Sequence, residues 1–202
     1  MNKLEPRIKS SGLRDPLPHD SAAKHVAGRA EYIDDMIEPE GLLHCYLGLS
    51  ARAHAEIVAI DLEAVRKAPD VVGVLTAADI PGQNDISSVH KHDEPVFATE
   101  RVQFWGQPIF AVLAETREAA RRAARLARIE YKDLPALLSI EAALESAQVL
   151  VTEPLTLERG DVEGGLAGAP HRVSGRIGIG GQGHFYLEGQ GGLGGAGGGG
   201  GG

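Results

Sequence analysis

The sequence has a single cysteine, Cys45, among its 202 residues. One cysteine excludes an internal disulfide framework, and it excludes an iron–sulfur cluster held by this chain alone because such clusters take several cysteine thiolates. No apolar run approaches the length that crosses a bilayer. The basic residues of Met1–Arg7 are not followed by the apolar core of a secretory signal. We therefore expect a globular protein of the cytoplasm with no membrane partner.

Basic residues are also scarce, with 20 Lys and Arg against 28 Asp and Glu and a formal net charge of −8. Phosphate groups are bound by clustered Lys and Arg, so this balance argues against nucleic acid as a partner. The length fits one or two domains of ordinary size, and a hydrophobic fraction of 43% suits a packed core.

The first half of the chain alternates strand-like and helix-like segments. Short apolar or β-branched runs predict three strands, at Leu42–Leu49, Ile57–Ile60 and Val71–Leu75. Asp61 is placed to cap a short helix that runs through Arg66. Thr76 and Asp79 have the spacing of a capping box, in which each side chain satisfies a free backbone donor of the other residue. Residues 82–95 are polar and unpatterned, which predicts a long loop.

The second half repeats this rhythm around a longer helix. An apolar run predicts a buried strand at Pro108–Ala114, Thr116 is placed to cap a helix that ends near Ala127, and a further strand follows at Arg128–Tyr131. Four alanines recur at helical spacing and allow close packing on a sheet: Ala120, Ala123, Ala124 and Ala127. Four arginines point elsewhere and form a solvated face or touch a partner subunit: Arg117, Arg121, Arg122 and Arg125. We expect the two strands to lie in one sheet layer.

Beyond residue 134 the predicted elements are short. They are a helix capped by Ser139, a strand at Val149–Thr152 and a strand at Arg172–Ile179. In the predicted helix that Thr116 caps, we expect the Glu118 carboxylate to pair with Arg122 one helical turn later.

We expect structural roles for two further side chains. Cys45 lies in an apolar strand, and we expect it to be a buried small side chain rather than a nucleophile. Gln107 stands at the entry to a strand, where its amide can satisfy loop backbone groups.

The residue types of Gly180–Glu188 indicate a cofactor contact. Gly180 and Gly181 lack Cβ atoms and let the backbone come close to a bulky ligand. The Gln182 amide offers donors and an acceptor, which suit a metal-oxo group or the edge of a heterocycle. A turn residue in a glycine-rich bend is the alternative for Gln182. The stretch Gly178–Gly183 also fits the dinucleotide pattern G-x-G-x-x-G, but the helix that this fingerprint requires does not follow, so we reject a nicotinamide site.

Several segments, in the same order, resemble the N-terminal part of the molybdopterin-binding subunit of the xanthine dehydrogenase and aldehyde oxidase family, the molybdenum hydroxylases. Gly180–Glu188 is similar to that family's Gly-Gly-Gln-acid-His-Phe-Tyr-Leu-Glu segment, with Gly183 in place of the acid. The other similar segments are Pro18–Ser21, Gly28–Asp35, Phe104–Pro108, Glu130–Pro135 and Arg159–Val162. Because these motifs keep their order over most of the chain, the resemblance is stronger than one motif would make it.

The resemblance implies an α+β fold. It places an α/β hammerhead domain at residues 19–135 and the truncated start of a molybdopterin-binding domain at residues 136–190. Residues 1–18 would be a flexible lead, and residues 191–202 a disordered tail, since glycine loses the most backbone entropy on ordering. Of the 27 glycines, 20 lie at or after Gly160. A natural glycine linker and an erroneous reading of the gene are both open explanations.

The resemblance also implies a function for an intact parent protein: hydroxylation of hypoxanthine or xanthine, with oxygen from water, at a molybdenum–molybdopterin centre. It implies that Gln182 hydrogen-bonds an oxo ligand of molybdenum, with Gly181 beside the cofactor. FAD and 2Fe-2S clusters would lie on a partner subunit of a hetero-oligomer. The family's catalytic glutamate has no counterpart here, so we assign no catalytic residue and expect the chain alone to be inactive. The alternatives are a molybdenum hydroxylase for aldehydes or other N-heterocycles, and a non-catalytic hammerhead interaction module.

Two groups of residues contain possible metal ligands, and for each a metal site is the weaker explanation. His90–Glu94 could bind a divalent ion, although a solvated loop of mixed charge accounts for it better. His184 and Glu188 would share one face of a strand but lie too far apart to hold one ion. We therefore predict no metal-ligating residue.

Overall fold

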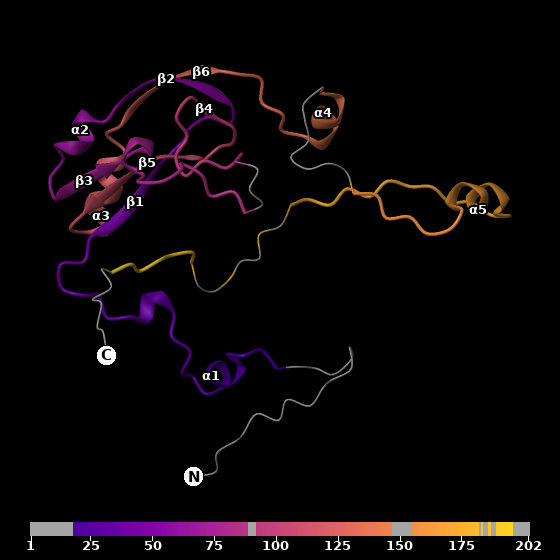
Figure 1. Cartoon of the computed structure of the whole chain (residues 1–202), viewed down its shortest axis with the longest axis horizontal. Helices are drawn as coiled ribbons and strands as arrows, with labels where there is room; N and C mark the ends of the chain where they lie inside the picture. Colours follow the sequence, from indigo (N-terminus) through magenta and orange to yellow (C-terminus); the bar gives the residue numbers. More distant parts are fainter. Residues whose placement is uncertain are drawn as a thin grey trace, which may run out of the picture. The chain divides into compact units, whose positions relative to one another are not determined.

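The computed structural model describes residues 18–88, 92–146, 155–181, 183, 186 and 189–195. The chain divides into two compact units, Pro39–Arg172 and a second unit made of Met1–Glu38 with Val173–Gly202. All strands found in the described residues belong to the Pro39–Arg172 unit (Figure 1). Mixed helix and sheet within one unit gives the α+β fold that the sequence predicts.

The first of two sheets has three strands in the order β1-β5-β3. The strands are β1 (His44–Leu49), β5 (Pro108–Ala114) and β3 (Val71–Leu75). β5 is central and runs antiparallel to both neighbours, with His44 of β1 opposite Ala114 and Leu75 of β3 opposite Ala111. Five of the seven β5 residues are buried, which explains its unbroken apolar run.

The second sheet has the order β4-β2-β6 and is also antiparallel. Its strands are β4 (Arg101–Val102), β2 (Ala55–Asp61) and β6 (Arg128–Asp133). Our expectation that the strands on either side of the long helix share one sheet is wrong, because β5 pairs with β1 and β3 whereas β6 pairs with β2. Pairing is decided by partners distant in sequence, which the local pattern does not identify.

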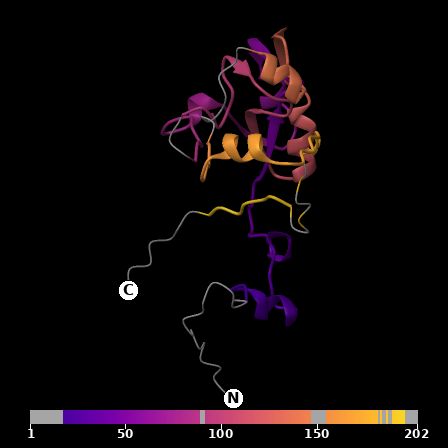
Figure 2. The same ribbon diagram turned by 90° about the vertical axis from the view of Figure 1, so that its right-hand side faces the viewer.

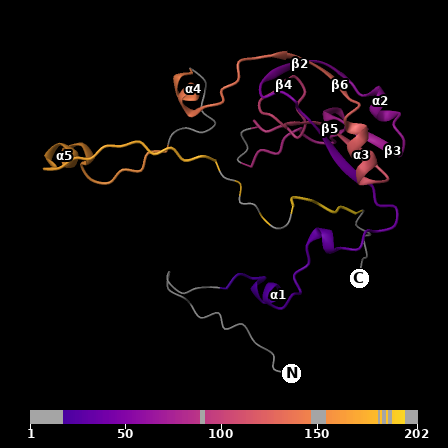
Figure 3. The same cartoon turned by 180° about the vertical axis from the view of Figure 1, so that it is seen from behind.

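The helix α3 (Arg117–Ala124) covers one face of the first sheet (Figures 1 and 3). Its first turn is capped by Thr116, whose hydroxyl oxygen accepts the Ala119 N–H at 3.1 Å. The helix ends three residues before the predicted position. Ala120 and Ala123 are buried as the spacing predicts, and Ala119 is buried with them, whereas Ala124 is half-buried and Ala127 lies beyond the end of the helix.

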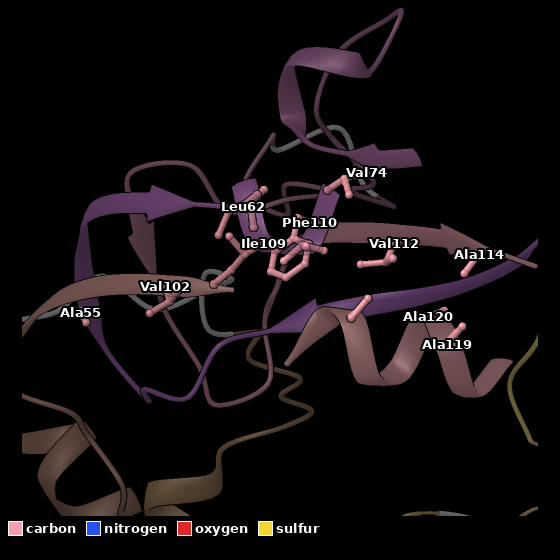
Figure 4. Packing of buried hydrophobic residues seen from close by; sticks show 13 residues of the cluster. Ala55, Leu62, Val74, Val102, Ile109, Phe110, Val112, Ala114, Ala119 and Ala120 are labelled. Carbon is pink, nitrogen blue, oxygen red and sulfur yellow. The ribbon is translucent and has the colours of Figure 1, made fainter. Parts of the chain in front are cut away.

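The core lies where α3 and the short helix α2 (Glu63–Arg66) meet the strands. Figure 4 shows the Phe110 ring near the centre of this core, with Ala119 and Ala120 on α3 beside the strand that carries Val112. The largest fully buried side chains are Phe110, Ile109, Val65, Val102 and Val112. Their burial is the main source of stability, since a fully buried side chain of this size contributes about 1.5–3 kcal/mol.

Two of the predicted caps form at Thr76 and Ser139, whereas α2 begins after Leu62 and the predicted cap Asp61 instead accepts the Glu63 N–H at 3.0 Å. The carboxylate of Asp79 accepts both the Thr76 N–H at 2.7 Å and the Thr76 hydroxyl at 2.9 Å at the start of the 3-10 turn η2 (Ala77–Asp79). These bonds lower the pKa of Asp79. Ser139 caps α4 (Ile140–Glu145) by accepting the Ala142 N–H.

Three short helices are absent from the sequence predictions. One of them, α5 (Val162–Gly168), is capped by Asp161, whose carboxylate accepts the Gly164 N–H at 2.8 Å. In the second unit, α1 (Ala22–Val26) and the 3-10 turn η1 (Ile33–Asp35) follow one another (Figure 2). Two glycines inside α5 hide the helical pattern, because glycine disfavours helix interiors.

Three sequence predictions need correction. Arg172–Ile179 forms no strand, because no partner for a ladder is found in the described residues. Glu118 pairs with Arg121, at 2.9 Å, and not with Arg122. Cys45 is exposed on β1 rather than buried.

Some predicted elements lie wholly or partly outside the described residues. The predicted strand Val149–Thr152 lies outside the described residues, as do residues 196–202 of the predicted tail. The proposed domain boundaries stay predictions. Within the described part of the chain, no helix is both long and apolar enough to span a bilayer.

Candidate functional site

The two glycines that begin the predicted cofactor segment lie in the open. Gly180 and Gly181 are exposed, and a Cβ atom added at either position would meet no other atom within 4 Å. Gln182 lies outside the described residues, so its role stays a prediction. The described residues around Gly181 therefore do not form a pocket for a pterin by themselves.

A long loop between η2 and β4 is tied to the core at both ends by one side chain. The Asn84 amide nitrogen donates to the Phe97 carbonyl oxygen at 2.8 Å, and the Phe97 N–H donates back to the Asn84 oxygen at 2.9 Å. Phe97 is buried, and the next residue, Ala98, donates its N–H to the Pro108 carbonyl at the start of β5. The two amide bonds close the loop against the central strand.

The tip of this loop is held by the Ser87 hydroxyl. It donates to Asp85 Oδ1 at 2.5 Å and accepts the N–H groups of Asp93 and Glu94, each at 3.0 Å. His92 Nδ1 lies 2.6 Å from the other Asp85 oxygen. The Ser87 hydroxyl bond is the main cause that lowers the pKa of Asp85.

This Ser–Asp–His set is not a nucleophilic triad, because the carboxylate stands between the hydroxyl and the imidazole. In a triad the imidazole contacts the hydroxyl directly and removes its proton. The set braces the loop instead. His90 and Lys91 of the proposed divalent-ion motif lie outside the described residues, and no cluster of three metal-ligating side chains occurs in the residues that are described.

A tight corner before β5 presents two aromatic side chains to solvent. The Gln107 side chain is buried, and its oxygen accepts the Gln103 N–H at 2.7 Å, which confirms that this amide satisfies loop backbone. Gly106 takes φ +85°, a conformation that favours glycine. Phe104 and Trp105 remain 55% and 70% exposed beside a cleft of about 750 Å³. Exposed aromatic residues on a fixed corner are typical of an interaction surface.

A second cleft, of about 470 Å³, lies along β1. Its lining comes from β1, β5, β6, the segment after β1 and the end of α3: Tyr46, Leu47, Leu49, Ala51, Arg52, Phe110, Ala124, Arg125, Ala127, Ile129 and Tyr131. The Arg52 guanidinium lies 5.6 Å from the centre of the Tyr131 ring and pairs with Asp133 at 2.9 Å. Sequence reasoning missed this cleft because its lining is dispersed over the chain, and only the arginine pattern of α3 pointed toward it.

The family model described as aldehyde oxidase and xanthine dehydrogenase, a/b hammerhead domain, matches residues 27–135. The chain belongs to this family. Its resemblance to the molybdenum hydroxylases is thereby confirmed, and the two antiparallel sheets with α3 make up most of the matched hammerhead region.

Curated relatives carry the similarity beyond the matched domain. A xanthine dehydrogenase of Oryza sativa subsp. japonica is 40% identical over 184 residues, which are 90% of this chain and 13% of the relative. A xanthine dehydrogenase/oxidase of Felis catus is 44% identical over 173 residues, 86% of this chain and 13% of the relative. The chain thus spans 13% of the length of these two relatives.

A solved structure shares the fold. The aldehyde oxidoreductase from Desulfovibrio gigas superposes with a TM-score of 0.57 at 29% sequence identity, covering 66% of this chain and 16% of that chain. The hammerhead architecture predicted from the sequence is therefore observed in the larger unit of this chain.

Proposed function

We propose that the chain is the hammerhead-containing part of a molybdenum hydroxylase that acts on hypoxanthine or xanthine in the cytoplasm. The observation that carries this proposal is the similarity to xanthine dehydrogenases over 86–90% of the chain, well beyond the hammerhead match at residues 27–135. An aldehyde oxidase of Rattus norvegicus is similar over 87% of the chain, so the extent of the likeness supports the family, and the somewhat higher identity to xanthine dehydrogenases supports the purine substrate.

In the proposed parent protein, a substrate C–H bond and one water become a C–OH bond, two protons and two electrons. The molybdenum–molybdopterin group would supply this chemistry when bound, and 2Fe-2S clusters and FAD on a partner subunit would accept the electrons. The residues of this chain would position the cofactor. Gln182 would donate an amide hydrogen bond toward the cofactor, and Gly181 would let the backbone come close to it.

The hammerhead unit serves as the rigid support in this proposal. Loops that carry function are held by such scaffolds, and here the loop from Asn84 to Phe97 is tied to β5 by paired amide bonds. Because the described residues around Gly181 build no pocket, the remaining walls of the cofactor site would come from other parts of the parent protein.

The proposal predicts that the 202-residue chain alone is inactive. The chain is expressed, and xanthine-dependent reduction of a dye is measured together with its molybdenum and pterin content. We expect neither turnover nor bound pterin, because no general base is assigned here and one amide cannot replace it. Xanthine turnover by the chain with bound pterin would refute this part of the proposal.

An aldehyde substrate is the second candidate. The solved aldehyde oxidoreductase from Desulfovibrio gigas shares the hammerhead fold at 29% identity, so the fold alone does not separate the two substrates. Parallel assays of the complete parent protein with xanthine and with an aromatic aldehyde distinguish them. We expect xanthine to be the better substrate, since the identity to the two xanthine dehydrogenases is 40–44%, against 39% for an aldehyde oxidase of Rattus norvegicus.

A further inference from the structure

The chain leaves the second sheet at Asp133, the last residue of β6. Asp133 lies opposite Ala55, the first residue of β2, whose side chain is fully buried in the core. Residues 134–138 then have no regular structure before α4 begins at Ile140 (Figure 1). The direction of this exit segment is therefore set by individual contacts and not by a repeating pattern of hydrogen bonds.

His54 holds the exit segment at two points. The Leu134 N–H donates to the His54 carbonyl oxygen at 3.0 Å, which extends the pairing of β2 and β6 by one residue. His54 Nδ1 lies 2.6 Å from the Pro135 carbonyl oxygen. A carbonyl oxygen only accepts hydrogen bonds, so Nδ1 carries the proton and is the donor here. Since proline has no N–H, its carbonyl is the one backbone group through which Pro135 can be held.

Arg52 holds the residue at which the exit begins. Its Nε atom lies 2.9 Å from a carboxylate oxygen of Asp133, and its guanidinium lies 5.6 Å from the centre of the Tyr131 ring. The Arg52 and Asp133 side chains are 48% and 70% exposed, so solvent screens this ion pair and it contributes little alone. We therefore expect the His54 bond to be the stronger of the two side-chain contacts.

Ser50 fixes the loop that carries Arg52 and His54. Its hydroxyl accepts the Arg52 N–H at 3.0 Å and donates to the Arg52 carbonyl oxygen at 2.8 Å. Ser50 is itself buried, and its N–H donates to the Gln107 carbonyl oxygen at 2.9 Å. With Ser50 at one end and Ala55 at the other, the loop is anchored to buried residues on both sides.

The contacts that hold the exit segment end at Pro135. No hydrogen bond joins residues 136–138 to the rest of the chain that the structure describes. A held stretch, residues 133–135, is thus followed directly by one without such contacts.

We propose that Arg52 and His54 form a latch that fixes the direction in which the chain leaves the second sheet, and that this latch opens locally while the sheet stays folded. Both are positioning residues, because they act on the backbone through Asp133 and Pro135. The chain beyond Pro135 leads to the predicted cofactor segment, so a fixed exit restricts where the following residues can lie. The latch is a property of residues 50–135 and does not depend on the proposed substrate.

Amide exchange at Leu134 in the 202-residue chain measures how often the latch opens. We expect His54→Ala to raise the Leu134 exchange rate by about five- to tenfold, since one hydrogen bond is lost while the bond to the residue-54 carbonyl remains. His54→Asn should restore most of the protection, because its amide nitrogen can replace Nδ1 as the donor. Arg52→Ala should raise the rate by about two- to threefold. The Ile57 amide, which donates to the Glu100 carbonyl oxygen at 2.8 Å on the other edge of β2, should keep its rate in every variant.

The direction of the exit segment is measured separately, by pulsed electron paramagnetic resonance. Cys45 is the single cysteine and is exposed on β1, so it takes one spin label. Ala136→Cys, at an exposed position directly after the latch, takes the second. We expect a narrow distribution of distances between the two labels, and a broader one when His54→Ala is added.

Three results would overturn the proposal. The first is a Leu134 exchange rate that His54→Ala leaves unchanged. The second is an equal acceleration at Leu134 and Ile57, which would mean that the sheet unfolds and that no local latch opens. The third is a distribution of label distances that is as broad before His54→Ala as after it.

Discussion

Replacing Gly48 with alanine tests how tightly β1 packs on β5. A Cβ atom at Gly48 would overlap the Phe110 ring atoms Cε1, Cζ and Cδ1, and Phe110 is only 2% exposed at the centre of the core. The ring cannot move away freely, because protein interiors are close-packed. Overpacking of this kind costs about 1–3 kcal/mol. For a domain of roughly 100 residues this corresponds to a fall in Tm of about 4–24 °C.

The matched control is Gly73→Ala. Gly73 lies in β3, pairs with the same central strand, and a Cβ there would meet only Leu113 Cδ1, at an ordinary 3.8 Å. We expect this variant to be unchanged or stabilised by about 0.5–1 kcal/mol, since alanine loses less backbone entropy than glycine. Urea unfolding followed by far-UV circular dichroism measures both. If Gly48→Ala unfolded at the same urea concentration as Gly73→Ala, the reasoning about the Phe110 contact would be refuted, whereas recovery of stability by adding Phe110→Leu would support it.

Two further predictions concern the loop before β4. Asn84→Ala removes both amide bonds to the Phe97 backbone; it should cost about 1–2 kcal/mol and speed proteolysis within the loop, and equal proteolysis rates would contradict the clamp. Because the Ser87 hydroxyl lowers the pKa of Asp85, the charged carboxylate stabilises the fold above its unfolded pKa of about 3.9 and this contribution is lost as pH falls through the lowered value. Amide exchange at Glu94 should thus stay slow at neutral pH and accelerate, beyond its intrinsic pH dependence, only below about pH 4. Asp85→Asn should remove that change, and an acceleration that begins near neutral pH would contradict the role of Asp85.

Local sequence patterns identified the elements whose cause is local. The apolar run of Pro108–Ala114 is a central strand with the predicted bounds, and the caps at Thr116 and Ser139 form as expected. The pairing of strands was not predictable in this way. β5 and β6 follow one another along the chain but join different sheets, because their partners β1 and β2 are chosen by long-range packing.

Side chains whose contacts are close in sequence were predictable, and side chains whose burial depends on strand order were not. The Gln107 amide, which acts on backbone four residues away, was predicted correctly. Cys45 was expected to be buried because its strand is apolar, but β1 lies at the edge of its sheet and leaves the thiol exposed. Partial burial still raises the pKa of the Cys45 thiol, which keeps it protonated at neutral pH.

The candidate cofactor site was predicted from residue types and from resemblance, not from a local structural pattern. Gln182 was singled out by residue types and by resemblance, and neither fixes where its amide points. The cleft along β1 was missed because residues from three distant parts of the chain build it: 46–52, 110 and 124–131. Contacts that join distant segments are set by the tertiary fold, so no window of sequence contains them.

The most direct test of the proposed function is xanthine hydroxylation by the complete parent protein, comparing Gln182→Ala with the matched control Gln190→Ala. The account predicts that the unaltered protein converts xanthine to its hydroxylated product, that Gln182→Ala lowers kcat/KM by roughly 10- to 100-fold, and that Gln190→Ala leaves kcat/KM nearly unchanged. A molybdenum-loaded parent protein that does not hydroxylate xanthine, or a Gln182→Ala variant as active as Gln190→Ala, would contradict it.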